Sequence, residues 1–283
     1  MAIAADDLDI LIAVALKGYI PKNAQIIEIG AQQLDDKFLR AADKVECLGQ
    51  IFDRQSDFAL PAPLASQSGL DPAAPLARDF WAWLGFGYAS IDIDGSPGSI
   101  PLDLNYDAVP RDRLGKYHVV TNYGTTEHVA NQLNAFKVIH DLTALNGVMI
   151  HTLPAQGMQN HGLINYNPKF FWMLSRSNGY QWLHEGYNGF GVGEPAYPLP
   201  QNIVERATLF SPHAKPNLET MRVADGSIRI ALQKKFDLPF VAPLDVPTGV
   251  ATDNPALARR YWTVFTPNAF EHPNPPARLR GEE

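Results

Sequence analysis

The chain has 283 residues, of which 46% are hydrophobic and 10% aromatic, so it can bury a large core in one large domain or two modest ones. Its formal net charge is −7, whereas proteins that bind nucleic-acid phosphates carry clusters of positive charge, so we expect no nucleic-acid partner. The single cysteine excludes an internal disulfide, and the acidic start MAIAADDLD lacks the basic region of a secretory signal. These features predict a cytoplasmic protein. No apolar stretch approaches the ~18 residues of a membrane span, so no membrane partner is expected.

Strand-like and helix-like segments alternate along most of the sequence. An amphipathic helix over LDILIAVALKGYI leads into a strand, QIIEIG, and then a helical stretch near residues 35 to 47. Further strands are expected at YASIDID, SIPLDLN, YHVVTNY and GVMIHTLP, with helices at about residues 126 to 145 and 169 to 178. The last two strands, YQWLHEGYN and SIRIALQKKFD, have no convincing crossover helix between them. The pattern predicts a mostly parallel sheet, covered by helices on both faces, with an antiparallel finish.

Two segments interrupt this alternation. Residues 50 to 78 are rich in Pro, Ala and Ser, and residues 189 to 202 have the punctuation of a long loop. We expect one domain over residues 1–283, with an insertion at about 50–78 and loops at about 154–168 and 186–202 that form a substrate pocket. The oligomeric state stays open, because the chain shows no specific signal for self-association.

The turn after the first strand is the first candidate ligand site. The apolar run stops at Gly30, which lets the backbone pass close beneath a ligand. A dinucleotide-binding turn would have two further glycines, where this chain has Ala31, Gln32 and Gln33. This difference argues against a dehydrogenase. A plain strand-to-helix turn without a ligand is the structural alternative.

The ordered strand ends resemble those of class I S-adenosylmethionine-dependent methyltransferases. The resemblance begins with IIEIGAQQ, continues through YASIDIDG and SIPLDLN, and reaches YHVVTNYGTTEHV, so it covers roughly residues 10 to 240. It implies a three-layer α/β fold whose mostly parallel, seven-stranded sheet has an antiparallel last strand. It also implies S-adenosylmethionine as the cofactor and methyl transfer to a small-molecule acceptor, with oxygen favoured as the atom methylated.

The resemblance implies a cofactor site along the strand ends. Glu28 would take the ammonium group of the cofactor directly or through water. Asp92, favoured over Asp94, would accept both ribose hydroxyls. Asp103 would bind the adenine amine, and Leu104 would add a backbone contact. The implied cofactor-binding residues are Glu28, Gly30, Gln32, Asp92, Asp103, Leu104, Asn122 and Tyr123.

Some of these polar residues have a purely structural alternative. Asp92 and Asp94 can instead cap a turn before the following glycine, and Asp103 can cap the turn before NYDAVP. Asn122 and Tyr123 follow the fourth strand and would line the methionine end of the pocket, where an aromatic face suits a sulfonium cation.

Three histidines are candidates for the general base that an oxygen nucleophile would use. His128 follows the fourth strand, His151 ends the fifth, and His161 lies in the next loop, so all three should share one rim. We favour His161 and His128 as catalytic, while Glu127 either orients His128 or caps a helix. A metal site built from these histidines has no support in their spacing, because there is no H-x-x-x-H pair and no cysteine cluster. We therefore expect no metal.

Acceptor binding is assigned to His151, Tyr166 and Trp172. Aromatic side chains that follow one another at helical spacing, however, more often pack in the core beneath a helix. The competing function is a catalytically inactive, methyltransferase-like binding or assembly module. Gln32 is the best evidence for it, because the resembling family usually has glycine there. Polar groups at every ligand-facing strand end favour an enzyme instead.

Overall fold

A six-stranded mixed sheet forms the centre of the computed structural model, which describes residues 2–34, 38, 41–55, 57–58, 75–94, 96, 98–158, 161–188 and 225–245. The strands are β2 (Gln25–Ile29), β4 (Gly87–Ile91), β5 (Tyr117–Tyr123), β6 (Thr143–Gln156), β7 (Tyr180–Asn188) and β8 (Gly226–Lys234). They lie in the order β4-β2-β5-β6-β8-β7, with β4, β2, β5 and β6 parallel. β8 runs antiparallel to both of its neighbours, which confirms the predicted antiparallel finish.

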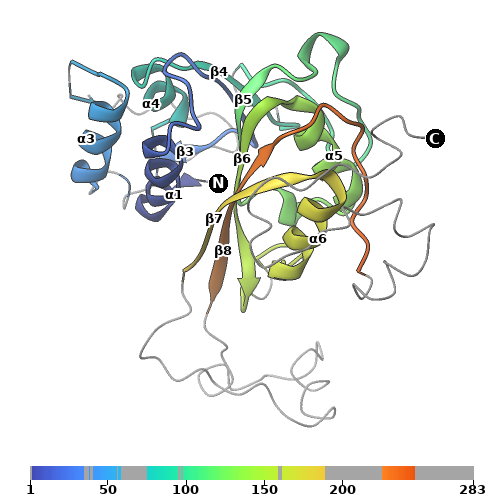
Figure 1. The fold of residues 1–283 in the computed structure, drawn as a ribbon. Coiled ribbons are helices and arrows are strands. Elements are labelled where there is room, and N and C mark those ends of the chain that lie inside the picture. The colour runs from blue at the N-terminus through green and yellow to red at the C-terminus, as the bar shows by residue number, and fades with distance from the viewer. Residues whose placement is uncertain are drawn as a thin grey trace, which may run out of the picture.

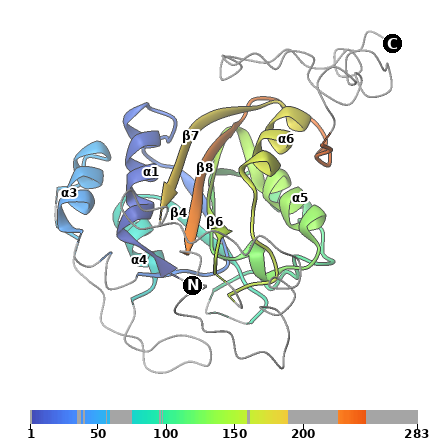
Figure 2. The ribbon, with the colours of Figure 1, turned by 90° about the horizontal axis from the view of Figure 1, so that it is seen from below.

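Helices cover both faces of this sheet (Figure 1). One layer holds α1 (Ala5–Leu16), α3 (Ala42–Ile51) and α4 (Ala77–Trp83), and the other holds α5 (Gln132–Leu142) and α6 (Pro168–Asn178). Figure 2 shows the same layers from below, with α3 lying beyond α1. The remaining elements are β1 (Ala2–Ile3), which pairs in parallel with β3 (Gln33–Leu34), and the 3-10 helices η1 (Arg111–Arg113) and η2 (Thr126–His128).

The central strands are buried on both faces because successive side chains point to opposite helical layers. Ile26 packs in one apolar cluster with Leu11 of α1, whereas its neighbour Ile27 packs in a second cluster with Phe136 of α5. All four side chains are almost completely buried. With both faces covered, the ends of the parallel strands are where the sheet can present polar groups to a ligand.

The expected third strand is reduced to a single bridge. A seven-stranded sheet was predicted, but the central sheet of the described residues has six strands, and the segment SIPLDLN contributes only a parallel bridge between Ile91 and Ile100. Ile100 N donates to the Ser90 carbonyl at 2.8 Å, and Asp92 N donates to the Ile100 carbonyl at 3.1 Å. Pro101 has no N–H with which to extend the ladder. The bridge nevertheless places this segment in parallel beside β4.

The helix after β5 begins later than the sequence predicted. Residues 126 to 128 form η2, and α5 starts at Gln132 after Asn131, whose side chain accepts a hydrogen bond from Asn134 N at 3.2 Å. The prediction for α6 is confirmed almost to the residue. That helix has Pro168 in its first turn and ends before Gly179, which adopts a left-handed conformation (φ 65°).

The expected loops are only partly described. Most of the inserted segment at 50–78, and residues 189–202 of the last loop, lie outside the described residues. In the segment at 154–168, the first three residues belong to β6, which continues through Gln156. Within the part of the chain that the structure describes, no helix is long and apolar enough to cross a membrane.

Candidate active site

The carboxyl ends of β2, β4, β5 and β6 meet at one edge of the parallel sheet. Open α/β sheets bind their ligands outside this edge. Two turns leave the edge side by side, one after β2 and one after β5. They are joined by the Thr125 hydroxyl, which donates a hydrogen bond to the Ile29 carbonyl. The predicted site residues are distributed around these two turns.

The turn after β2 is held from beneath by Glu28. Its Oε1 accepts a hydrogen bond from Trp81 Nε1 at 2.7 Å, and its Oε2 accepts from Gln32 N at 3.0 Å and Tyr88 OH at 2.8 Å. Complete burial raises the pKa of Glu28 to about 7, although all three hydrogen bonds favour the ionised form. A direct contact with an ammonium group would require one of these hydrogen bonds to open. In this conformation, Glu28 shapes the turn.

Gly30 and Gln32 close the turn. Gly30 has a left-handed backbone (φ 79°), and its N–H donates to the Ile91 carbonyl at 2.8 Å, which ties the turn to β4. The Gln32 side chain folds back, and its Nε2 donates to the Gly30 carbonyl at 2.9 Å. Its Oε1 is buried and has no hydrogen-bond partner among the described residues. The side chain of Gln32 thus stabilises a turn that lacks the further glycines.

Asp92 lies beside this turn, as predicted. Its Oδ2 accepts a hydrogen bond from Ala31 N at 3.0 Å, and its Oδ1 accepts from Asp94 N at 3.3 Å. The side chain is half-buried, and this burial raises the pKa of Asp92. A carboxylate offers about four lone-pair positions, so two remain for a ligand. Asp92 therefore combines partial exposure with unused acceptor capacity.

The segment that follows the bridge between Ile91 and Ile100 is held by hydrogen bonds within residues 103–107. Asp103 Oδ1 accepts a hydrogen bond from Asn105 N at 2.8 Å, and Asp103 N donates to Asp107 Oδ2 at 2.7 Å. Leu104 is buried, and its carbonyl accepts from Asn134 Nδ2 at 2.9 Å. These contacts match the structural alternative for Asp103, a turn cap. The adenine contacts of Asp103 and Leu104 stay predictions.

Asn122 and Tyr123, at the end of β5, are both buried. Asn122 Oδ1 accepts from Thr126 N at 3.2 Å, and its Nδ2 lies 2.9 Å from Thr126 Oγ1 and 3.3 Å from His151 Nδ1. Tyr123 packs in the apolar cluster beneath α1. Both residues lie at the predicted strand end, but their side chains support the turn from within.

His151 does not share a rim with the other two histidines. Its ring is fully buried between Phe136 of α5 and Phe171 of α6, with centroid distances of 5.6 and 5.3 Å. Burial lowers the pKa of His151 to about 3, so the ring is neutral at physiological pH. Tyr166 is also buried, and its hydroxyl lies 2.8 Å from Thr126 Oγ1. The prediction that three histidines lie at one rim is therefore wrong for His151, because aromatic side chains close over it.

His128 and His161 do come together. Their exposed rings lie 5.4 Å apart between centroids, and His161 Nε2 lies 3.6 Å from Glu127 Oε1. The Glu127 side chain is only 1% exposed, and burial raises the pKa of its carboxyl group. Partial burial and the nearby His161 lower the pKa of His128. The sequence had suggested only that Glu127 orients His128 or caps a helix, and the three-residue group was missed.

Trp172 lies apart from this group. It sits on α6, and its 42% exposed ring packs edge-on against Trp182 of β7 at a centroid distance of 6.4 Å. The preceding residue, Phe171, instead faces the buried side chains of His151 and Tyr166, and its ring centroid lies 5.9 Å from that of Tyr166. Two of the three residues assigned to the acceptor, His151 and Tyr166, are thus buried, and Trp172 packs toward β7.

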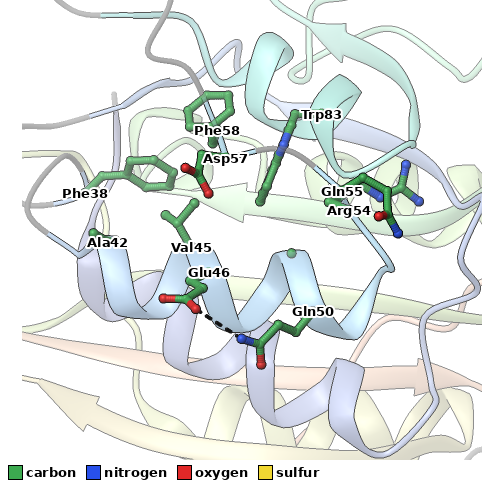
Figure 3. Close-up of a pocket in the computed structure, with 11 residues that line it drawn as sticks. Phe38, Ala42, Val45, Glu46, Gln50, Arg54, Gln55, Asp57, Phe58 and Trp83 are labelled. Atoms are coloured by element: carbon green, nitrogen blue, oxygen red, sulfur yellow. Dashed lines mark hydrogen bonds between the residues drawn. The ribbon is translucent and has the colours of Figure 1, made fainter.

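A separate pocket of about 610 Å³ lies between α3, the segment that follows it and α4 (Figure 3). Phe58 and Trp83 border it from one side, and Val45 and Glu46 border it from α3. None of the predicted site residues lines this pocket. Its lining includes Gln50, Arg54 and Phe58 of the segment at 50–78, which was expected to help form a substrate pocket, but the contribution of α3 was not predicted.

Similarity to known proteins is found among solved structures. No family model matches the sequence, and no curated protein matches it. Among solved structures, the chain is similar to an S-adenosylmethionine-dependent methyltransferase from Archaeoglobus fulgidus, with 9% identity, a TM-score of 0.39, and coverage of 80% of this chain and 94% of that one. It is also similar to phosphoethanolamine N-methyltransferase 2 from Haemonchus contortus, with 11% identity, a TM-score of 0.40, and coverage of 80% of this chain and 52% of that one. The strand order and the antiparallel β8 give this chain a methyltransferase-like α/β fold.

Proposed function

We propose that this chain is a methyltransferase that uses S-adenosylmethionine and acts on a small-molecule acceptor, with an oxygen as the favoured methylated atom. The observation that carries the proposal is the position of Asp92. Its partly exposed carboxylate lies beside the left-handed turn at Gly30, at the carboxyl edge of the parallel sheet. A carboxylate in this place suits the vicinal hydroxyls of a ribose.

The donor and acceptor groups of the turn fit a nucleoside better than a pyrophosphate. The Ala31 and Gln32 N–H groups, which could bind a pyrophosphate, already donate to Asp92 and Glu28. Asp92 keeps lone pairs for two hydroxyl donors, and Glu28 acts as a positioning residue that fixes the turn. Bound S-adenosylmethionine would supply an electrophilic methyl group on a sulfonium centre.

The remaining predicted residues extend the site along the same edge. Asp103 and Leu104 would lie on the adenine side, and Asn122 and Tyr123 would support the methionine end from below. This assignment rests on the order of the strand ends, because these four residues make their described contacts within the protein. Their part in the site would be to position the turns that surround the cofactor.

His161 and His128 are the residues proposed to remove the proton from an acceptor hydroxyl. Both rings are exposed at the turn after β5, and Glu127 Oε1 lies 3.6 Å from His161 Nε2. His161 is the stronger candidate, because His128 has no carboxylate contact of its own among the described ion pairs. Methyl transfer otherwise depends on positioning and on the exclusion of water.

The test is calorimetric titration of the purified chain with S-adenosylmethionine and S-adenosylhomocysteine. We expect one site per chain, and we expect Asp92→Ala to weaken binding at least tenfold, or ~1.4 kcal/mol. Asp94→Ala is the matched control, because Asp94 is exposed and adjacent but does not bind the Gly30 turn. Equal affinities for the two variants would contradict the assignment of Asp92. An acceptor screen would follow.

The second candidate function is a binding module that has lost the cofactor. The observation that favours it is the buried Gln32 side chain, which closes the turn through its hydrogen bond to Gly30. If this side chain blocks the cofactor, Gln32→Gly should gain S-adenosylmethionine binding that the wild type lacks. A folded wild-type chain that binds neither nucleotide would reject the methyltransferase proposal.

A further inference from the structure

Three side chains with metal-binding atoms converge at the turn after β5. Glu127, His128 and His161 each offer one ligand atom, and these atoms all lie within 4.8 Å of one another. A zinc ion with bonds of ~2.1 Å in tetrahedral geometry separates neighbouring ligand atoms by about 3.4 Å. The 3.6 Å between Glu127 Oε1 and His161 Nε2 is already close to that value. Small rotations of two exposed imidazole rings would bring the third ligand atom into range.

The Glu127 carboxylate is held in a close-fitting enclosure. Leu163 N and Ile164 N donate to the Glu127 carbonyl at 2.7 and 3.1 Å, which holds the next loop against η2. A Cβ at Gly162 would lie 2.8 Å from Glu127 Cγ, and one at Gly124 would lie 3.3 Å from Glu127 Oε1. Glycine at these two positions therefore lets the backbone approach the Glu127 side chain from two sides.

Among the described residues, the Glu127 carboxylate is buried without a hydrogen-bond partner. Both of its oxygens are inaccessible and have no hydrogen-bond partner among the described residues, and its ionic contact there is the 3.6 Å approach to His161. A buried carboxylate that has no partner is destabilising, because burial removes its hydration and no nearby group replaces it. A cation placed between Glu127 and the two histidines would remove this cost. The turn thus places an unpartnered carboxylate beside two imidazole rings.

We propose that Glu127, His128 and His161 bind one divalent transition-metal ion, for which Zn²⁺ is the best fit. Two imidazole nitrogens and one carboxylate oxygen suit Zn²⁺, Co²⁺ or Fe²⁺, whereas Mg²⁺ and Ca²⁺ prefer oxygen ligands. The two histidines are exposed, so water or a substrate can complete the coordination. With a metal bound, the two rings would be ligands instead of bases, and the ion would supply a Lewis acid that lowers the pKa of an acceptor hydroxyl. This last consequence alone depends on the function proposed above.

The experiment is a metal titration of the chain without any affinity tag, because a histidine tag would itself bind the ion. The protein is treated with a chelator, desalted and titrated with Co²⁺, whose visible absorption reports nitrogen and oxygen ligands. Zn²⁺ is then added to displace it. The variants are Glu127→Gln and His161→Ala. The controls are His118→Ala and Cys47→Ser, which remove a histidine and the lone cysteine outside the group. Circular dichroism without metal establishes that each variant is folded.

We expect one Co²⁺ per chain in the wild type and in both controls, with displacement by Zn²⁺ but not by Mg²⁺. Affinity should fall at least tenfold in Glu127→Gln and in His161→Ala. No stoichiometric binding, or binding that these two variants leave unchanged, would overturn the proposal. The S-adenosylmethionine titration is performed on the same samples. It distinguishes a failed metal site from a failed cofactor site, because Asp92 belongs to the other turn.

Discussion

Glu28 and His151 are fully buried titratable side chains whose pKa values move in opposite directions. Burial raises the pKa of Glu28 from 4.5 to about 7 and lowers the pKa of His151 from 6.5 to about 3. In both cases, the folded protein favours the neutral form. Each group therefore contributes to the pH dependence of unfolding, but over a different range of pH and with a different sign.

Glu28 should make the protein less stable as the pH rises from about 4.5 to 7. Its folded pKa lies above its unfolded value, so the stabilisation is present below pH 4.5 and is lost as the pH passes through 7, by up to ~3 kcal/mol. Glu28→Gln should not show this pH-dependent loss of stability, because glutamine does not ionise. Its amide N–H will face one of the three hydrogen-bond donors that surround Glu28, which lowers stability equally at both pH values. Urea unfolding of both proteins at pH 5 and pH 8 measures the difference. Identical pH dependences would contradict the raised pKa.

His151 should make the protein less stable as the pH falls below 6.5. The unfolded chain takes up a proton near pH 6.5, whereas the folded chain resists it until about pH 3, which costs ~1.4 kcal/mol per pH unit. His151→Leu should lose less stability than the wild type between pH 6.5 and 4. His118→Ala is the control, because His118 is half-exposed. If both variants follow the wild-type acid curve, the lowered pKa is wrong.

At the scale of elements, the loop after β6 docks on η2 through Gly162. Gly162→Ala would place a Cβ 2.8 Å from Glu127 Cγ and 3.0 Å from the Glu127 carbonyl, so the loop must move away. We expect a loss of stability of ~1–3 kcal/mol and weaker Co²⁺ binding, because His161 moves with the loop. Gly115→Ala is the control, since its Cβ meets nothing within 4 Å and its cost comes from a left-handed backbone (φ 62°). It should lower stability and leave Co²⁺ affinity unchanged.

Elements with strong local signals were predicted well from the sequence. β5 lies where YHVVTNY placed it, because β-branched and aromatic residues such as Val119, Val120 and Tyr123 favour a strand. α6 begins at Pro168, is capped by Asn167 and ends before Gly179, and these residues are ordinary start and stop signals. The prediction of the third strand was wrong because Pro101 ends the pairing of that segment after one residue.

The candidate site was less predictable, because most of its geometry comes from distant segments. The position of Asp92 beside the Gly30 turn could be predicted, because polar residues at adjacent parallel strand ends lie near one another. The group of Glu127, His128 and His161 was not predicted, because no local spacing relates Glu127 to His161. They meet only because the loop after β6 hydrogen-bonds to the Glu127 carbonyl. The burial of His151 also depends on aromatic residues from two helices.

At the scale of the whole molecule, the sheet should be most rigid at its centre. β2 and β5 have strands on both sides and helices over both faces, whereas β7 pairs only with β8 in the described part of the chain. Hydrogen exchange measured by mass spectrometry should show the slowest exchange in peptides from β2 and β5 and faster exchange in β7. Equal protection of β7 and β5 would contradict this order. The two site turns thus leave the most rigid part of the protein.

The hydroxyl of Thr125 joins those two turns, since it donates to the Ile29 carbonyl directly before Gly30. A ligand that orders one turn therefore also acts on the segment that the other ligand must order. By thermodynamic reciprocity, the factor by which a metal ion changes nucleotide affinity must equal the factor by which the nucleotide changes metal affinity. Thr125→Val removes the connecting hydroxyl while keeping a similar shape. We expect the variant to bind each ligand with an affinity that does not depend on the other.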